Sequence, residues 1–289
     1  MAIFWAAVNL FFAAFNDMVF KGYARKPRSH GLFVTIVGVI WFVSAACCVT
    51  APVKHWHATL FWGAVSGFFS VGGNMLMLDA MRKLDAGICA TIYRLNLVPA
   101  VLLAFFLLDE PISLTQWCGI VCACLAVLAF IPRSGDTVRK GVTLSLVFMI
   151  TASLMRAGMG ISYRYGFTHH GASEQMVPVI NSVFWIVGGL IYALIRERDK
   201  LKALAEWETC RKLVGYGALS GALVTGIVLT MAYSLNDARG HASVVLPIMQ
   251  MSFLLTGILS VIFLNEKITL VKVLALLFGV AAVLLLGIK

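Results

Sequence analysis

Long apolar runs separated by short polar joints extend through the sequence from one end to the other. A helix that crosses the hydrocarbon core of a bilayer needs about 20 mostly apolar residues. Runs of that kind lie at about 2–22, 31–50, 59–81, 86–108, 112–131, 141–162, 175–195, 211–234, 241–264 and 268–288. Because the runs are continuously apolar and do not alternate with polar positions, they predict helices and not barrel strands. We therefore expect an all-α integral membrane protein with ten transmembrane helices.

Composition supports the same class. Hydrophobic residues make up 61% of the chain and charged residues only 12%, whereas a soluble domain carries about 25% charged residues. The first run lacks a basic start and a small-residue cleavage site, so we expect a retained span and not a signal peptide. Cys118, Cys122 and Cys124 have no second group at ligand spacing, so they predict buried small side chains and no metal site.

An internal repeat divides the chain into two halves. The hexapeptides at 108–113 and 264–269 match at an offset of 156, and those at 62–67 and 216–221 match at an offset of 154. If each copy holds five helices, the second copy enters the membrane inverted relative to the first, as in many secondary transporters. We expect one repeat at 1–133, a second at 139–289 and a short linker at 134–138.

The basic residues separate by side. With ten spans, 17 of the 23 Lys and Arg residues fall on one face, and only Lys54, Arg164, Arg239 and Lys289 fall on the other. By the positive-inside rule the crowded face is cytoplasmic, which predicts that both termini lie outside. The net charge of +10 then belongs to loops at a membrane surface, and no nucleic-acid partner is expected.

Arg94 is the most informative polar residue, because a charge inside a span needs a cavity or a partner. It lies near the middle of the run at 86–108, between Tyr93 and Asn96, and its repeat counterpart at offset 156 is Gln250. We expect these positions to form a substrate site near the bilayer midplane. The alternative is that Arg94 makes a structural salt bridge or bonds to the carbonyls of a kinked helix.

The first run carries a second polar cluster. Asn9, Asn16 and Asp17 lie 7 and 8 positions apart and therefore share one helical face. Asp17 is a candidate arginine partner, proton carrier or anchor for a substrate amine, and the alternative is an interfacial Asp near a helix end. Arg156 is the counterpart of Asn16 at offset 140, and it is expected either in the site or snorkelling to the interface.

The remaining site candidates are deep polar or aromatic side chains: Asn74, Asn181, Trp185 and Tyr233. Aromatic rings with a polar atom suit a cavity wall. We expect the first, third, fourth, sixth, eighth and ninth spans to surround the cavity, with hinges at Pro99, Pro178 and Pro247. The fifth and tenth spans carry small residues four apart and few polar groups, which predicts closely packed scaffold helices or a dimer contact.

The repeat resembles a known family. The pattern Asp85-Ala86-Gly87, an apolar helix with Pro99, and then Glu110-Pro111-Ile112-Ser113 resembles the EamA type of the drug/metabolite transporter superfamily. The second copy has Ala242-Ser243, Pro247 and Glu266-Lys267-Ile268-Thr269 in the same layout. The resemblance covers essentially the whole chain and implies a monomeric ten-helix secondary transporter of small metabolites, often acting outward. It also implies cytoplasmic termini, which disagrees with the distribution of basic residues.

An enzyme is not expected. The sequence has no Gly-x-Ser-x-Gly elbow, no His-Glu-x-x-His motif and no phosphate-binding glycine loop. We therefore expect no cofactor, and transport energised by protons or by exchange. The predicted protein is an exporter of a small zwitterionic or anionic metabolite in a bacterial inner membrane, as a monomer or a homodimer among membrane lipids. A translocator of a lipid-linked head group and a non-transporting sensor or partner subunit remain as alternatives.

Overall fold

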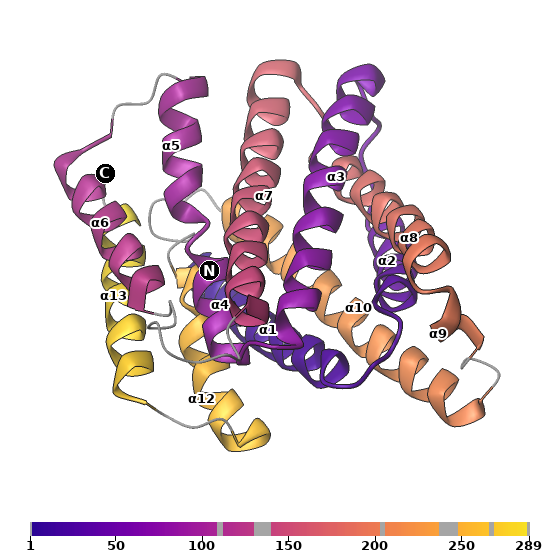
Figure 1. Cartoon of the computed structure of the whole chain (residues 1–289). Helices are drawn as coiled ribbons and strands as arrows, with labels where there is room; N and C mark the ends of the chain where they lie inside the picture. The colour runs from indigo at the N-terminus through magenta and orange to yellow at the C-terminus, as the bar shows by residue number, and fades with distance from the viewer. Residues whose placement is uncertain are drawn as a thin grey trace.

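The computed structural model describes residues 2–108, 112–129, 140–202, 206–236, 248–265 and 269–287. All regular structure in these segments is helical (Figure 1). The helices are α1 (Ala2–Ala24), α2 (His30–Ala46), α3 (Trp56–Met81), α4 (Ala86–Arg94), α5 (Leu97–Leu108), α6 (Leu114–Ala129), α7 (Lys140–His170), α8 (Met176–Arg196), α9 (Arg198–Lys202), α10 (Trp207–Asn236), α12 (Ser252–Leu264) and α13 (Leu270–Gly287).

Six helical segments are long and apolar enough to cross a membrane. They are Ile3–Ala24, Trp56–Met81, Ala86–Leu103, Gly141–Phe167, Met176–Arg196 and Trp207–Met231. Four shorter apolar helices, His30–Ala46, Leu114–Ala126, Ile248–Leu264 and Leu270–Leu286, overlap the other four predicted spans. The helical membrane class is therefore supported, and the count of ten spans stays a prediction.

The predicted span at 86–108 is interrupted between α4 and α5, close to Pro99, where a hinge was expected. α4 ends at Arg94, and α5 begins at Leu97. Pro99 has no N–H, and its ring opposes the carbonyl of the residue four positions earlier, which is Leu95. The second copy has the same interruption, since Met251 separates a helical turn at 248–250 from α12. Met251 is the counterpart of Leu95 at offset 156.

Glycines allow α2 and α8 to approach backbone to backbone. A Cβ atom placed on Gly31 would lie 2.5 Å from the Gly189 oxygen and 2.5 Å from the Ala193 nitrogen. A Cβ on Gly189 would lie 2.6 Å from the Gly31 oxygen. Only glycine fits such a contact, so these positions hold the two halves of the chain together.

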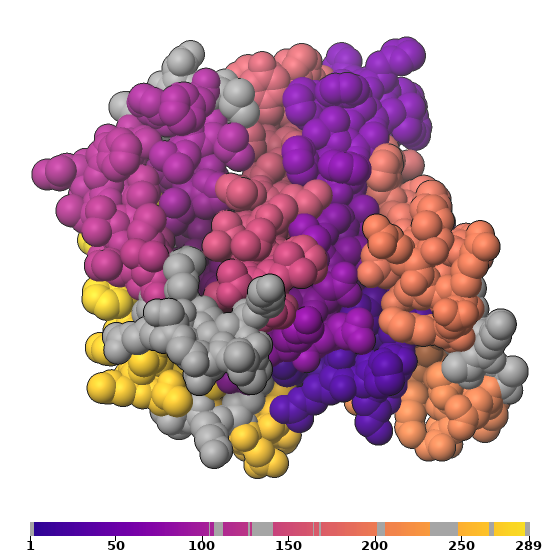
Figure 2. All heavy atoms as spheres, in the orientation of Figure 1, coloured from indigo at the N-terminus to yellow at the C-terminus, as the bar shows by residue number. Residues whose placement is uncertain are grey.

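The duplicated Gly-x-x-Ser-Gly segments also pack helices. Gly63 and Gly67 of α3 face α8, whereas Gly217 and Gly221 of α10 face α2. At the edge of the molecule, α6 and α13 pack against each other, as expected for scaffold helices (Figure 1). α7 packs along α3 and α5, and Figure 2 shows their side chains forming one continuous surface on the face that is drawn.

One end of the bundle gathers basic side chains and is called the basic end here. The Lys21 ammonium at the end of α1 donates to the carbonyls of Met81 and Leu84, which follow from α3 toward α4. Lys272 of α13 pairs with Asp85, the residue before α4, at 2.5 Å. These contacts place the ends of α1 and α3 beside the starts of α4 and α13.

Further contacts extend this end. Arg25 donates to the Leu264 carbonyl at the end of α12, at 2.8 Å. The Glu197 carboxylate, after α8, accepts from the Ser29 hydroxyl and the Gly31 N–H at the start of α2. Lys21, Arg25 and Lys272, three of the basic residues predicted on one face, therefore lie at the same end of the bundle.

The opposite end is formed by the α2–α3 and α7–α8 connections. The Gln175 side-chain oxygen accepts from the N–H groups of Thr50 and Ala51, at 3.0 and 3.1 Å. The Thr59 hydroxyl accepts from the Ser173 N–H at 3.0 Å. α7 runs on to His170 here, so Arg164 lies within a helix and not in the predicted loop.

Candidate substrate cavity

A cavity of about 430 Å³ lies between the two halves of the chain, within the size range of small-molecule sites. We call it the central cavity. Its walls come from α1, α2, α3, α4, α7, α8 and α10. The polar side chains in the lining are Asn16, Asp17, Ser70, Asn74, Tyr93, Arg94, Arg156, Tyr163, Glu174 and Gln175. The other lining residues are aliphatic, aromatic or sulfur-bearing, and they include Pro178.

The central cavity reaches the surface at the opposite end. Cys48, Glu174 and Gln175 line it there, and all three are exposed. Its inner part is bounded by Asp17, Tyr93 and Arg94, which are 1%, 4% and 7% exposed. Beyond these residues lies the basic end, where Lys21 and Lys272 join helices to each other. The structure therefore has one accessible and one obstructed side.

An ion pair forms the inner boundary. One Arg94 nitrogen lies 3.4 and 3.3 Å from the two carboxylate oxygens of Asp17, and the Thr256 hydroxyl donates to Asp17 at 3.1 Å. Arg94 is the last residue of α4, directly before the helix break at Leu95. The structural salt bridge that the sequence left open is thus present, and it ties α1, α4 and α12 together.

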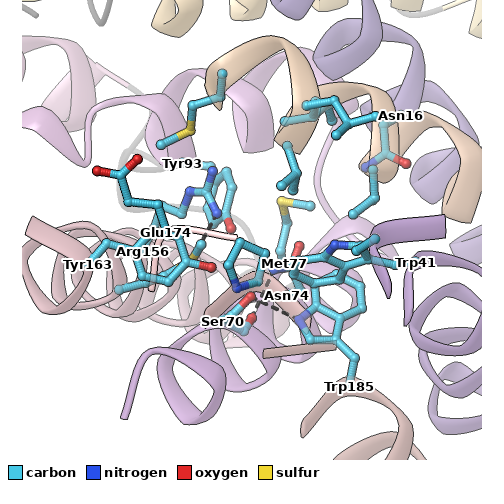
Figure 3. Close-up of a pocket in the computed structure, with 18 of the residues that line it drawn as sticks. Asn16, Trp41, Ser70, Asn74, Met77, Tyr93, Arg156, Tyr163, Glu174 and Trp185 are labelled. Carbon is cyan, nitrogen blue, oxygen red and sulfur yellow. Dashed lines mark hydrogen bonds between the residues drawn. The ribbon is translucent and has the colours of Figure 1, made fainter. Parts of the chain in front are cut away.

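A polar and aromatic wall faces this ion pair. The Trp185 indole N–H donates to the Ser70 hydroxyl at 2.8 Å, and Asn74 donates to the Ser70 carbonyl at 2.9 Å. Trp41 meets Trp185 edge to face, with ring centroids 5.7 Å apart. Figure 3 shows this wall across the cavity from Arg156 and Tyr163. The cavity therefore has an aromatic side and a basic side.

Arg156 differs from Arg94 in its partners. Its side chain donates to the Met159 sulfur at 3.1 Å, and a thioether is a weak acceptor. No carboxylate of the described residues lies within 4 Å of it. Arg156 therefore presents a guanidinium charge to the cavity that described side chains do not neutralise at close range.

Seven of the twelve predicted site residues line the central cavity: Asn16, Asp17, Asn74, Tyr93, Arg94, Arg156 and Trp185. Asn9 instead links α1 to α10, donating to the Ile227 carbonyl at 2.6 Å and to Thr230 at 3.0 Å. Asn181 is buried outside the lining and donates to the Tyr163 hydroxyl at 2.8 Å.

The other three predicted residues do not join the wall that the structure describes. Asn96 is buried in the break after α4. Gln250 is partly buried and is not among the residues that line the central cavity, so its expected pairing with Arg94 across a shared site stays a prediction. Tyr233 belongs to α10, but its side chain lies outside the described residues.

The predicted set of spans around the cavity left out α2 and α8, although Trp185 of α8 was among the predicted site residues. Trp41, Ala45, Pro178 and Trp185 come from these helices, whereas α12 contributes no lining residue among those described. A signal was present, because Ile-Trp-Phe-Val at 40–43 recurs as Phe-Trp-Ile-Val at 184–187, at an offset of 144. Tyr163 and Ser70 had no comparable signal.

No three His, Cys, Asp or Glu side chains in the described part of the chain are grouped as they would be around a metal ion. The buried hydrogen bonds and the aromatic wall suit the non-covalent binding of an organic molecule.

Comparison with known proteins adds the family. Residues 1–131 and 143–288 match the model of the EamA-like transporter family. A solved structure described only as "Crystal structure of protein" matches with a TM-score of 0.59 over 98% of this chain and 95% of its own, at 12% sequence identity, which shows a shared fold alone. The comparison with curated proteins found no significant match. With both halves matched, the chain belongs to the EamA-like transporter family of the drug/metabolite transporter superfamily and is a multi-pass membrane protein.

Proposed function

We propose that this protein is a secondary transporter that moves a small zwitterionic or anionic metabolite by alternating access. The observation that carries the proposal is the central cavity, which reaches exposed residues at one end and stops at the buried Asp17–Arg94 pair toward the other. A carrier needs a site that is accessible from one side at a time, and a cavity open at one end supports this proposal.

Contacts that exchange between the two halves support an inverted repeat. In the first copy Gly67 of α3 faces Phe184 of α8. The repeat counterpart of Gly67 is Gly221 of α10, at an offset of 154, and the counterpart of Phe184 is Ile40 of α2, at an offset of 144. Gly221 and Ile40 are also in contact. The lining follows the same rule, because the counterparts of lining residues on α3 lie on α10 and line the cavity too.

The directions of matched helices support the inversion. α2 begins beside the end of α8, where Gly31 meets Ala193, and it ends beside the start of α8, where Thr50 meets Gln175. Matched helices therefore run in opposite directions. Inverted repeats of this kind can exchange their conformations, which would close the open side of the cavity and open the other.

The contacts at the basic end would then break during transport. Opening that end requires Lys21 to leave its carbonyls and Lys272 to leave Asp85. We propose proton coupling or exchange as the energy source, with Asp17 as the candidate proton carrier, because it is the buried carboxylate of the lining. We further propose outward transport across a bacterial inner membrane by a monomer or a homodimer, with no resident cofactor.

Counterflow in proteoliposomes tests the function. Purified protein is reconstituted with an unlabelled anionic or zwitterionic solute inside, and entry of the labelled solute is followed. Transient accumulation above equilibrium is expected for a carrier, since the loaded site must reorient in both directions. Empty liposomes and a channel control set the background. Movement of phosphate-bearing lipids without counterflow of any solute would contradict this proposal and support a head-group translocator.

A further inference from the structure

Two arginines line the central cavity, and they are in different electrostatic situations. Arg94 is held by Asp17 at 3.3 Å, and the same carboxylate accepts from Thr256. Their charges cancel within the protein, so binding of a substrate anion by Arg94 would first have to break a buried ion pair. Breaking such a pair costs several kcal/mol, which makes Arg94 a poor anchor for a ligand.

Arg156 has no carboxylate within 4 Å among the described residues. It lies on α7 with Met159, Tyr163 and Phe167, at spacings that put all four on one face of the helix. The guanidinium carries five donors, and one of them bonds to the Met159 sulfur. Donors of a charged group inside a membrane span are costly when they lack good acceptors. An anionic ligand would supply those acceptors.

The charge balance of the lining fixes the sign of the ligand. The lining that the structure describes contains two carboxylates, Asp17 and Glu174. Asp17 is neutralised by Arg94, and Glu174 lies at the exposed rim, where water screens it. Among the described side chains, the interior therefore carries about one uncompensated positive charge. A monoanion balances it, whereas a dianion or a cation would leave a net charge in a site with few polar partners.

The aromatic wall indicates the rest of the ligand. Trp41 is 2% exposed, and its indole nitrogen has no hydrogen-bond partner in the described structure. Together with Trp185 it faces the cavity from the side away from Arg156 (Figure 3), and Met77 and Val228 also line the cavity. Apolar rings and aliphatic side chains favour an apolar ligand body. The orphaned indole N–H can also donate to a polar atom of the ligand.

We infer that Arg156, and not Arg94, anchors the substrate, and that the substrate class is a monoanionic carboxylate with an apolar, ring-bearing body. The carboxylate would accept two hydrogen bonds from the planar guanidinium, the geometry that arginine favours. The Tyr163 hydroxyl accepts from Asn181 and so keeps its own proton for donation toward the same carboxylate. The ring would lie against Trp41 and Met77. This inference rests on the proposed transport function for its biological meaning.

Binding of a matched probe series to purified wild-type protein tests the ligand class. The probes are phenylacetate, its neutral amide phenylacetamide, phenethylamine and phenyl phosphate, each followed by thermal stabilisation and by isothermal titration. Phenylacetate is expected to bind, and the amide to bind at least roughly tenfold more weakly, as for loss of a charge-assisted hydrogen bond. Equal binding of phenylacetamide, preferential binding of phenethylamine or phenyl phosphate, or no binding of any probe would overturn the inference.

Variants test the anchor. Arg156→Gln is expected to raise the Kd for phenylacetate at least roughly tenfold, and Arg156→Lys is expected to lower the affinity less. Arg198→Gln is the control: it removes an exposed charge at the basic end and is expected to bind phenylacetate as the wild type does. Unchanged binding by Arg156→Gln overturns the assignment. If Arg156→Gln does not fold, the wild-type probe series and Arg156→Lys still decide.

Failure of the inference and failure of the function are distinguishable in the same preparation. Phenylacetate binding without counterflow of any solute would refute the transporter proposal and leave the anion site standing. Counterflow of another solute that is insensitive to Arg156→Gln would refute the site and leave the transporter proposal standing.

Discussion

Removing one member of the Asp17–Arg94 pair is expected to destabilise the protein more than removing both. The closest nitrogen of Arg94 and oxygen of Asp17 are 3.3 Å apart, and the side chains of Arg94 and Asp17 are 9% and 2% exposed. With an effective dielectric constant of about 20, two unit charges at that distance interact by about 5 kcal/mol. Asp17→Asn or Arg94→Gln alone leaves the other charge buried without its partner, at a cost of about 3–5 kcal/mol.

The double variant removes both charges. Because no unpaired charge remains, we expect it to be less destabilised than either single variant, with a coupling free energy of about 3 kcal/mol or more. The free energy of unfolding is measured by titrating SDS into mixed micelles and following tryptophan fluorescence. Asp17→Asn combined with Arg198→Gln is the control, and its effects should add, since Arg198 is exposed and bonds to the Leu194 carbonyl. Additive losses for Asp17→Asn and Arg94→Gln would refute the account of the pair.

Three further outcomes are expected. Gly189→Ala should lower the free energy of unfolding by about 2 kcal/mol or more, because its Cβ would lie 2.6 Å from the Gly31 oxygen. Gly215→Ala is the control: a Cβ there would have nothing within 4 Å, so it should stabilise the helix by up to about 1 kcal/mol. Equal effects of the two variants on the unfolding temperature would contradict the close α2–α8 contact. Burial acts to raise the pKa of Glu197, but hydrogen bonds from Lys200, the Gly31 N–H and Ser29 outweigh it and hold that pKa below the usual 4.5. This contribution to stability is present above pH 4.5 and is lost as the pH falls through the lower folded value, so Glu197→Gln should flatten the acid limb of a melting-temperature profile, and an unchanged limb would count against the network. In a protein whose only cysteine is Cys48, an exposed residue of the cavity lining, a membrane-impermeant maleimide should react from outside intact cells and react more slowly when phenylacetate is present; labelling only after the cells are opened would refute the orientation inferred from the basic residues.

The sequence by itself determined the class of the protein and much of its internal order. Apolar runs of membrane-spanning length require helices, because backbone groups in hydrocarbon must bond within their own segment. The repeat, readable in short matches at offsets of 156 and 154, indicated which helices correspond. The small residues Gly63, Gly67, Gly217 and Gly221 indicated close packing, and contacts at all four positions confirm it.

The candidate site was only partly predictable. Polar residues inside spans stood out because hydrocarbon penalises them, and seven of those chosen line the cavity. Trp41 and Tyr163 did not stand out, because an aromatic residue in an apolar run is equally at home against lipid, in a core or in a cavity. Periodicity places a side chain on a helix face but does not say what that face meets.

Partnership was decided by the tertiary structure alone. Asp17 and Arg94 are 77 positions apart and meet only because α1 packs beside α4, so the sequence could not tell that Arg94 is neutralised while Arg156 is not. Gln250 lies before a similar interruption at Met251 and is not among the residues that line the cavity. Local patterns fix helices and their faces through interactions within a few residues. The contacts between helices depend on the packing of the whole chain, and in this protein they decide which charge is free to bind a ligand.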